Sequence, residues 1–357
     1  MRQSGLFGLS DHLKRLSAHG DPLEELSRIV DFEVFRSTLV AALAYGDGSK
    51  GGRPPYDPVA MLKVLILAAQ NNVSDARMEY LIRDRLSWLR FLGFDLGVAT
   101  PDANTIRLFR EKLTEAGALD ELFADFDRQL KQQGYLAMGG QIVDATLVAA
   151  PKQRNTQAEK DAIKDGKTAG EIWPEPARSA QKDTDARWTL KFAKGRPAAN
   201  GRPQIDIAIP SFGYKSSIAI CRAFGFIRKG KVTDGARFDG RMLRDVVTGD
   251  NTASDVWADT AYRSQANEKW LKAQGRVSRI HRKKPRGKPM PDHVRRANAT
   301  KSKIRARVEH VFAQQKAKMG LFIRTIGINR AEAKITLANL AYNMNRLIFH
   351  ERRAAMG

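Results

Sequence analysis

The stretch MGGQIVDATLVAA, residues 138–150, marks a change of pattern along the chain. Gly139 and Gly140 interrupt the helical pattern before them, because glycine loses more conformational freedom in a helix than other residues do. The residues that follow are apolar and β-prone, and Asp144 stands among them. We therefore predict an α+β or α/β protein in two parts. An all-α region covers residues 1–137, and an α/β domain begins with this strand and covers residues 138–357.

Further strands and helices are predicted after this first strand. YKSSIAICRAFGFI and RKGKVTDG, residues 214–235, have the pattern of a hairpin. ASDVWADTAY, residues 253–262, predicts a short strand that ends at an acid, Asp259. A short helix over 265–275, a further strand over 276–284 and two long helices, at about 292–319 and 330–350, complete the chain.

Residues 152–203 differ from their surroundings. They are charged, rich in Ala, Gly and Pro, and show no apolar period. We interpret them as a long flexible insertion with at most one helix, since long loops inside compact domains are usually functional or disordered. Trp173 and Trp188 are expected to anchor the insertion to the body. The alternative for both is stacking on an unpaired base of DNA.

The first half shows repeated helix signals. Asp57-Pro58 predicts a helix N-terminus, and PDAN at 101–104 predicts another. Several short helices over about 54–116 are compatible with a helix-turn-helix unit, in which the helix after Pro101 enters the groove of DNA. Asn104, Arg107 and Arg110 would then face phosphates or base edges. An ordinary helical bundle, or a dimerisation region, is the alternative.

Charge is distributed unevenly. The net charge is +22, yet residues 1–150 hold 17 basic and 20 acidic residues. Between Arg276 and Arg307 there are 13 basic residues and a single acid, Asp292. Such a surplus indicates a polyanionic partner, and double-stranded DNA is preferred over a ribosome or a membrane surface. The single cysteine, Cys221, excludes a disulfide within the chain and fits a reducing cytoplasm. We expect no membrane partner, because no apolar run is long enough to span a bilayer.

One acid interrupts the basic segment RARVEHVFAQQK, residues 305–316. On a helix, Arg305, Glu309 and Lys316 fall within about 40° of one another, beside an apolar stripe. Glu309 is therefore expected at the edge of a buried face, in reach of Asp144 and Asp259 at strand ends. Three adjacent carboxylates require a cation, and Mg²⁺ is the usual one, with Mn²⁺ as a substitute. Taken singly, each acid also fits a turn former or a surface ion pair.

In combination these motifs resemble the Asp-Asp-Glu (DDE) transposases of bacterial insertion sequences, specifically the insertion-sequence-five group. IVDATLVAAPKQRNT is similar to the block of the first aspartate, VWADTAYRS to that of the second, and KSKIRARVEHVFAQQK to that of the glutamate. The signature Tyr-x2-Arg-x3-Glu-x6-Lys is matched by Arg305, Glu309 and Lys316. Ser302 replaces its tyrosine.

The resemblance implies a ribonuclease-H-like catalytic domain with the insertion after its first strand, and recognition of terminal inverted repeats by residues 54–116. It implies an enzyme with catalytic, metal-binding Asp144, Asp259 and Glu309 and two Mg²⁺ ions. This enzyme frees a 3′-hydroxyl and joins it to target DNA, while Arg305 and Lys316 contact phosphates. It also implies a homodimer or larger assembly in the bacterial cytoplasm, associated with the nucleoid. A nuclease or resolvase that only cleaves, and a non-catalytic DNA-binding regulator, remain as alternatives.

Overall fold

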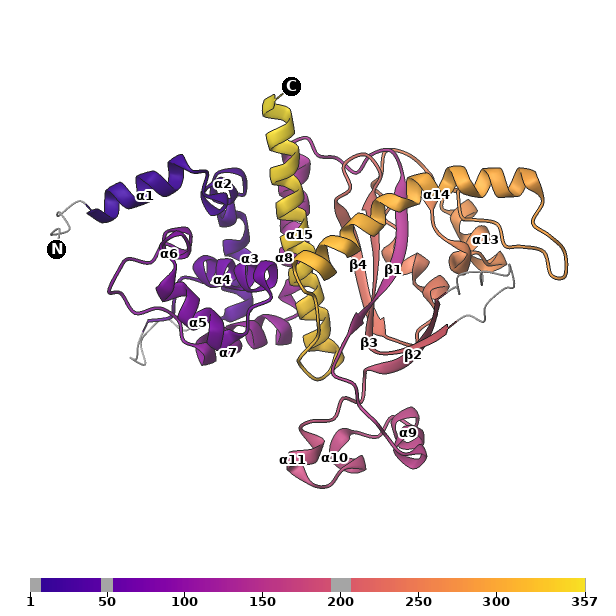
Figure 1. The fold of residues 1–357 in the computed structure, drawn as a ribbon, viewed down its shortest axis with the longest axis horizontal. Coiled ribbons are helices and arrows are strands. Elements are labelled where there is room, and N and C mark those ends of the chain that lie inside the picture. Colours follow the sequence, from indigo (N-terminus) through magenta and orange to yellow (C-terminus); the bar gives the residue numbers. More distant parts are fainter. Residues whose placement is uncertain (1–7, 46–53, 194–206, 357) are drawn as a thin grey trace, which may run out of the picture.

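The computed structural model describes residues 8–45, 54–193 and 207–356, and for 191–193 the backbone only. The N-terminal region is all helical (Figure 1). Its elements are α1 (Gly8–Ala18), α2 (Pro22–Ile29), the 3₁₀ turn η1 (Phe32–Phe35), α3 (Arg36–Leu43), α4 (Pro58–Asn71), α5 (Asp75–Asp84), α6 (Leu86–Leu92), α7 (Ala103–Glu115) and α8 (Ala118–Gln132). None of these helices, nor any other that is described, has the length and apolar character needed to cross a bilayer.

The second region is a six-stranded mixed sheet with helices on both faces. Its elements are β1 (Gln141–Ala149), α9 (Gln157–Lys164), α10 (Ala169–Ile172), α11 (Pro176–Ser179), β2 (Arg187–Ala193), β3 (Ile207–Cys221), β4 (Ile227–Asp234), η2 (Asp239–Met242), α12 (Leu243–Val246), β5 (Asp255–Trp257), η3 (Thr260–Tyr262), α13 (Gln265–Ala273), β6 (Val277–Ser278), α14 (Asp292–Ala313), the π-helical turn η4 (Gln314–Lys318) and α15 (Ile328–Met356).

Strand β1 lies inside the sheet, as expected for an apolar strand. It pairs antiparallel with β3 and parallel with β5. Its side chains alternate between two cores. Ile142 packs with residues of α14 and α15 on one face, and Val143 packs with residues of α12 and α13 on the other. Because side chains alternate along a strand, Asp144 and Thr146 share the α14 face with Ile142.

The N-terminal helices and the sheet share a continuous core. Helix α4 begins at Asp57, whose carboxylate accepts hydrogen bonds of 2.9 Å from the backbone N–H groups of Val59 and Ala60. Its leucines pack in the same cluster as Leu340 and Leu347 of α15. In Figure 1, α15 runs between the N-terminal helices and the sheet. The C-terminal helix thus contributes to the core of both regions.

A polar contact fixes α15 to the sheet. The β3–β4 register shifts between Ala219 and Ile220, and such irregularities leave backbone groups outside the ladder. The buried side chain of Asn343 pairs with both backbone groups of Ile227, accepting from its N–H at 2.9 Å and donating to its carbonyl at 2.8 Å. The amide therefore provides the hydrogen bonds of a missing strand neighbour.

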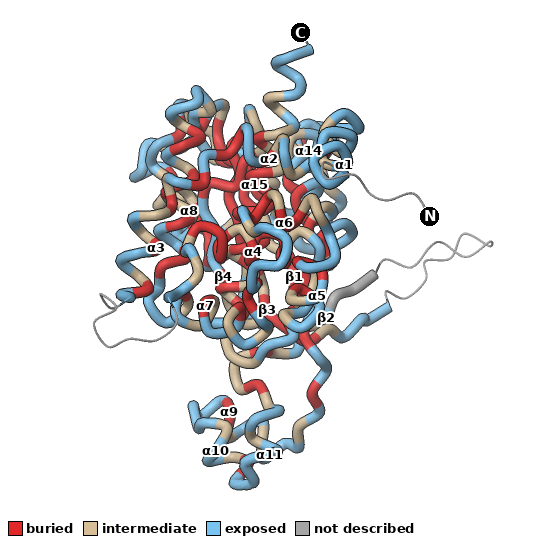
Figure 2. The backbone as a smooth tube through the Cα atoms, turned by 90° about the vertical axis from the view of Figure 1, so that its left-hand side faces the viewer, coloured by how far each residue is buried: buried red, intermediate tan, exposed pale blue. Residues whose placement is uncertain are grey.

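The insertion after β1 differs from the prediction. A flexible segment with at most one helix was expected over 152–203, but α9, α10 and α11 and strand β2 occupy much of it. Capping boxes at Thr156 and Thr168 start two of the helices. Trp173 is fully buried and donates from Nε1 to Glu159 at 2.7 Å. Figure 2 shows this helical module, residues 152–186, standing away from the body. Residues 194–203 of the predicted insertion lie outside the described residues.

Two glycines offer a matched test of the entry to β1. Gly140 has φ +92°, and a Cβ there would lie 2.5 Å from the Trp257 ring and 2.6 Å from the Asp255 carbonyl. Gly134 has φ +86° but open space around it. We expect Gly134→Ala to lower the free energy of unfolding by about 1 kcal/mol, the cost of a left-handed alanine. We expect Gly140→Ala to lower it by roughly 3 kcal/mol or more, since crowding adds to that cost. Urea unfolding measures both, and equal effects would contradict the close approach at Gly140.

Candidate catalytic site

Asp144 and Glu309 are joined through one arginine. Arg305 lies on the face of α14 that crosses β1 and donates from Nη1 to Asp144 Oδ2 at 2.5 Å and from Nη2 to Glu309 Oε1 at 3.0 Å. The Asp144 side chain is 14% exposed, whereas that of Glu309 is 60% exposed. The helix is held there by Val308, Val311 and Phe312, which pack on the sheet. Arg305 thus links Glu309 on α14 to Asp144 on the first strand.

The Asp144 carboxylate is in an unfavourable environment for its charge. Burial raises its pKa to about 6, while Arg305 and the Ala145 N–H counteract this rise. The negative charges of Asp259 and Asp239 contribute to this raised value. A buried carboxylate beside other acids favours binding either a proton or a cation.

Asp259 occupies the start of η3, just after β5. Its Oδ1 accepts a 2.7 Å hydrogen bond from the Ala261 N–H, which caps the turn. Asp239 begins η2 and pairs with Lys215 at 2.7 Å. Buried Asn267 donates to the carbonyls of Gly240 and Tyr262 at 2.7 and 2.8 Å, which ties the two turns together. Sequence reasoning missed Asp239, because FDGRMLRDVV, residues 238–247, has the pattern of a helix and gives no sign that its first turn approaches β1.

The carboxylates of Asp144, Asp259 and Glu309 are suitable ligands for a hard divalent cation. Their positions in the structure, however, do not form a metal site. Carboxylate oxygens are the ligands that Mg²⁺ prefers. Within the parts of the chain that the structure describes, however, no group of three His, Cys, Asp or Glu side chains is placed to hold a metal ion. The Arg305 guanidinium lies between Asp144 and Glu309 and partly neutralises both. The three predicted ligands therefore do not converge in this arrangement.

Lys316 contacts the same strand. It lies in the π-helical turn η4 and donates from Nζ to Thr146 Oγ1 at 2.5 Å. Since Thr146 is two residues beyond Asp144, Arg305 and Lys316 contact neighbouring positions on one face of β1. Ser302, at the place of the family's tyrosine, lies 3.5 Å from His281 Nε2. Burial, Arg305 and Lys301 lower the pKa of His281, a neighbour that sequence reasoning also missed.

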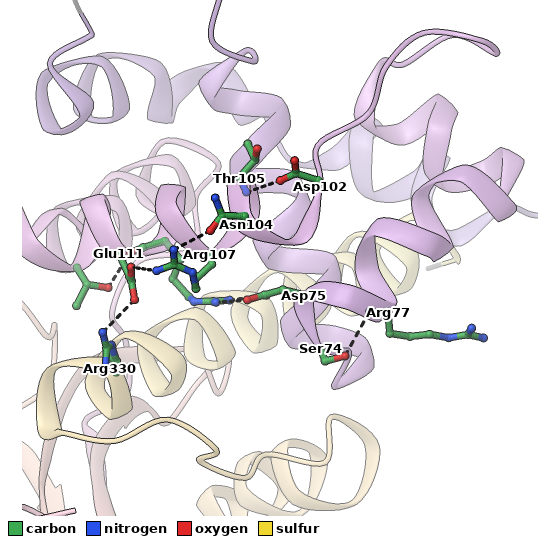
Figure 3. A network of polar contacts seen from close by, with 11 residues as sticks. Ser74, Asp75, Arg77, Asp102, Asn104, Thr105, Arg107, Glu111 and Arg330 are labelled. Atoms are coloured by element: carbon green, nitrogen blue, oxygen red, sulfur yellow. Dashed lines mark hydrogen bonds and ion pairs between the residues drawn. The ribbon is translucent and has the colours of Figure 1, made fainter. Parts of the chain in front are cut away.

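The predicted DNA-contacting residues of α7 form internal pairs. Arg107 contacts Asn104 at 2.7 Å and Glu111 at 2.5 Å (Figure 3). Arg110 binds both carboxylate oxygens of Asp75, at 2.9 and 2.5 Å, and so connects α7 to α5. Neither arginine contacts Asp144 or Glu309. Their role toward DNA stays a prediction.

Trp188 combines an anchored edge with an exposed face. Its Nε1 donates to the Gln153 carbonyl at 2.9 Å, and its ring lies 5.4 Å from that of Phe212. The residue is still 38% exposed. It lines a hollow of about 660 Å³ together with Arg154, Lys160, Lys164 and Arg187. The anchoring contact agrees with the structural role expected from the sequence, and the exposed ring leaves base stacking open.

The raised pKa of Asp144 predicts how stability of the metal-free protein depends on pH. Because its folded pKa, about 6, exceeds the unfolded value of about 3.9, ionisation opposes folding. The loss develops as pH rises from about 4 to 6 and persists above that range. We expect Asp144→Asn to raise the free energy of unfolding at pH 7.5 by on the order of 2 kcal/mol, and to have little effect near pH 4.

Arg305→Met is the matched variant for this experiment. It removes the cation that offsets the burial of Asp144, so it should lower stability at pH 7.5. Urea unfolding in the presence of a metal chelator, at several pH values from about 4 to 8, gives the free energy of unfolding of each variant as a function of pH. A destabilised Asp144→Asn at pH 7.5 would show that Asp144 is a structural ion pair instead.

Two family models match the chain. The model described as "Transposase domain (DUF772)" covers residues 11–112, which corresponds to the N-terminal helices. The model described as "Transposase DDE domain" covers residues 136–344, more than half of the chain, and includes Asp144, Asp259 and Glu309. No solved structure matches the chain. The fold, the basic α14 and the acids on β1 and after β5 agree with these matches. The chain therefore belongs to the DDE-domain transposases.

Proposed function

We propose that this transposase cuts DNA at terminal inverted repeats and joins the freed 3′-hydroxyl ends to target DNA. The observation that carries the proposal is the buried Asp144 on β1, which interacts with Asp259 and is held by Arg305 on a strongly basic helix. The mixed sheet with helices on both faces supports a ribonuclease-H-like fold with its insertion after the first strand. The motif resemblance to the insertion-sequence-five group supports placement there.

Asp144, Asp259 and Glu309 are the proposed ligands of two Mg²⁺ ions, which Mn²⁺ replaces. Such ions, when bound, lower the pKa of water and neutralise charge on the phosphodiester. The exposed Glu309 is free to turn toward β1 once Arg305 leaves it. Phosphate offers the Arg305 guanidinium a bidentate partner equivalent to carboxylate. When DNA binds, we therefore expect Arg305 to move from Asp144 to a phosphate group. Lys316 then contacts a phosphate close to Thr146.

The N-terminal helices are the proposed reader of the terminal repeats, with the helix-turn-helix-like unit over 54–116. Asn104 and Arg107 lie on the exposed side of α7, while Arg110 orients that helix through Asp75. Trp188 is proposed to stack on an unpaired base from its exposed face. Two ends must be brought together, so a homodimer or larger assembly is proposed, acting at the nucleoid in the bacterial cytoplasm.

Substitution of the three acids tests the proposal. We expect Asp144→Ala, Asp259→Ala and Glu309→Ala each to reduce strand cleavage of terminal-repeat DNA by at least about a thousandfold, the scale for removing a group that stabilises transition-state charge. Binding of the same DNA in chelator should persist. Asp255→Ala is the matched control, because this acid lies on β5 four residues before Asp259 but pairs with Arg279.

The products separate the alternatives. Purified protein, Mg²⁺ or Mn²⁺, terminal-repeat DNA and a target plasmid should give joined products. Cut but unjoined ends would indicate a nuclease or resolvase, and intact DNA with tight binding would indicate a regulator. Wild-type cleavage by any one of the three alanine variants would show that the catalytic acids are assigned wrongly.

A further inference from the structure

A second basic site lies between the two regions of the chain. A cleft of about 780 Å³ is bordered by the start of α5, by α7, by α15, by residues 322–326 and by the end of the helical module. None of Asp144, Asp259 and Glu309 lines it. The cleft is therefore separate from the candidate catalytic site, and the reading and catalytic regions both contribute to its wall.

Basic side chains outnumber acidic ones in this cleft. Two acids, Asp75 and Glu111, line it. The basic residues along its wall are Arg107, Arg110, Lys182, Arg324, Arg330 and Lys334. A concave wall with one prevailing sign of charge concentrates counter-ions of the opposite sign. The expected ligand is therefore an anion.

Three arginines already use both acids. Arg110 binds Asp75 through two hydrogen bonds. Glu111 accepts from Arg107 at 2.5 Å and from Arg330 at 3.0 Å (Figure 3). Both acids of the cleft wall are therefore already paired with arginines. Neither is left for the remaining basic groups of the cleft.

Lys334 and Arg324 are left without an acidic partner among the residues that the structure describes. Lys334 is half-buried on α15, and neither a hydrogen bond nor an ion pair to it is found in that part of the chain. Burial, Arg110 and Arg324 lower its pKa, and only Asp75 opposes them. Arg324 donates to the neutral amide oxygen of Asn72 at 2.9 Å. A half-buried ammonium that lies beside Arg324 and has no acid of its own is unfavourable unless a ligand compensates it.

We propose that this cleft binds the sugar–phosphate backbone of DNA, with Lys334 and Arg324 as its phosphate contacts. The inference rests on the proposed function only in taking DNA as the polyanion. Contacts to phosphate are independent of sequence and fix a protein's position on the duplex. Because α7 and α15 share the wall, DNA held here is positioned relative to both the reader and the sheet.

Salt dependence of DNA binding tests the proposal without cleavage. The full chain is titrated in chelator with duplex DNA that lacks terminal repeats, at several salt concentrations. The slope of log K against log salt should become shallower by about 1 in Lys334→Met and by about 2 in Lys334→Met/Arg324→Gln. Lys231→Met is the matched control and should keep the wild-type slope, because this lysine lies on β4 and already pairs with Glu332.

A thermal melt excludes a structural role for Lys334. Since its ammonium is desolvated without a partner, Lys334→Met should melt at the wild-type temperature or higher. A lower Tm together with an unchanged salt slope would overturn the proposal. The titration is made in chelator and does not measure cleavage, so failure of the catalytic proposal and failure of this one are distinguishable.

Two further measurements separate DNA from a small phosphate ligand. Cys221 is fully buried, so Thr325→Cys places a reactive thiol at the exposed wall of the cleft. It should cross-link to duplex DNA with a thiol-reactive group on its backbone, and Lys334→Met should reduce the yield. Inorganic phosphate or a mononucleotide that raises the Tm through Lys334, with no cross-link and unchanged salt slopes, would overturn the assignment to DNA.

Discussion

The catalytic region is organised around the burial of one charge. Asp144 lies in the middle of an interior strand, near two other acids and largely away from water. Such a carboxylate needs a cation, and Arg305 provides it from the facing helix. The guanidinium must therefore face the sheet, which fixes the rotation of α14 about its axis. The apolar side of α14 favours the same rotation, because Val308, Val311 and Phe312 pack on the sheet.

This pairing also explains why the acids do not converge in the structure. Arg305 interacts with Asp144 and Glu309 at once and reduces the repulsion between them. A second cation at the same place would have to compete with a fixed guanidinium. Under the proposed function, phosphate would change this balance, because it offers the arginine a bidentate partner equivalent to a carboxylate. The same residue would then both stabilise the free protein and bind nucleic acid.

Much of the fold could be predicted from local patterns. The Asp57-Pro58 helix start, the β3–β4 hairpin and the two long C-terminal helices are all confirmed. Their signals are periodicity, caps and glycine breaks, which act over a few residues. The sequence also predicted that Glu309 borders the buried face of its helix, but its side chain is 60% exposed and contacts Arg305 of the same helix.

Features that depend on long-range packing were missed. The helical module is ordered by buried Trp173 and two capping boxes rather than by an apolar period. Asp239 reaches the site through a turn held by Asn267, and the separation of these two residues along the chain gives no hint of the contact. The partners of Arg107 and Arg110 were likewise hidden, because a basic stripe looks the same whether it faces solvent or neighbouring acids.

The placement of α15 has a consequence for biosynthesis. The leucines of α4 share one core cluster with Leu340 and Leu347 of α15, which leave the ribosome long after the N-terminal helices. Domains commonly fold in order as they emerge from the ribosome. Here the core of the N-terminal helices is complete only after α15 has been synthesised. A prematurely terminated product lacks half of that interface and exposes apolar side chains instead. Exposed apolar surface of this kind favours aggregation and degradation of the fragment.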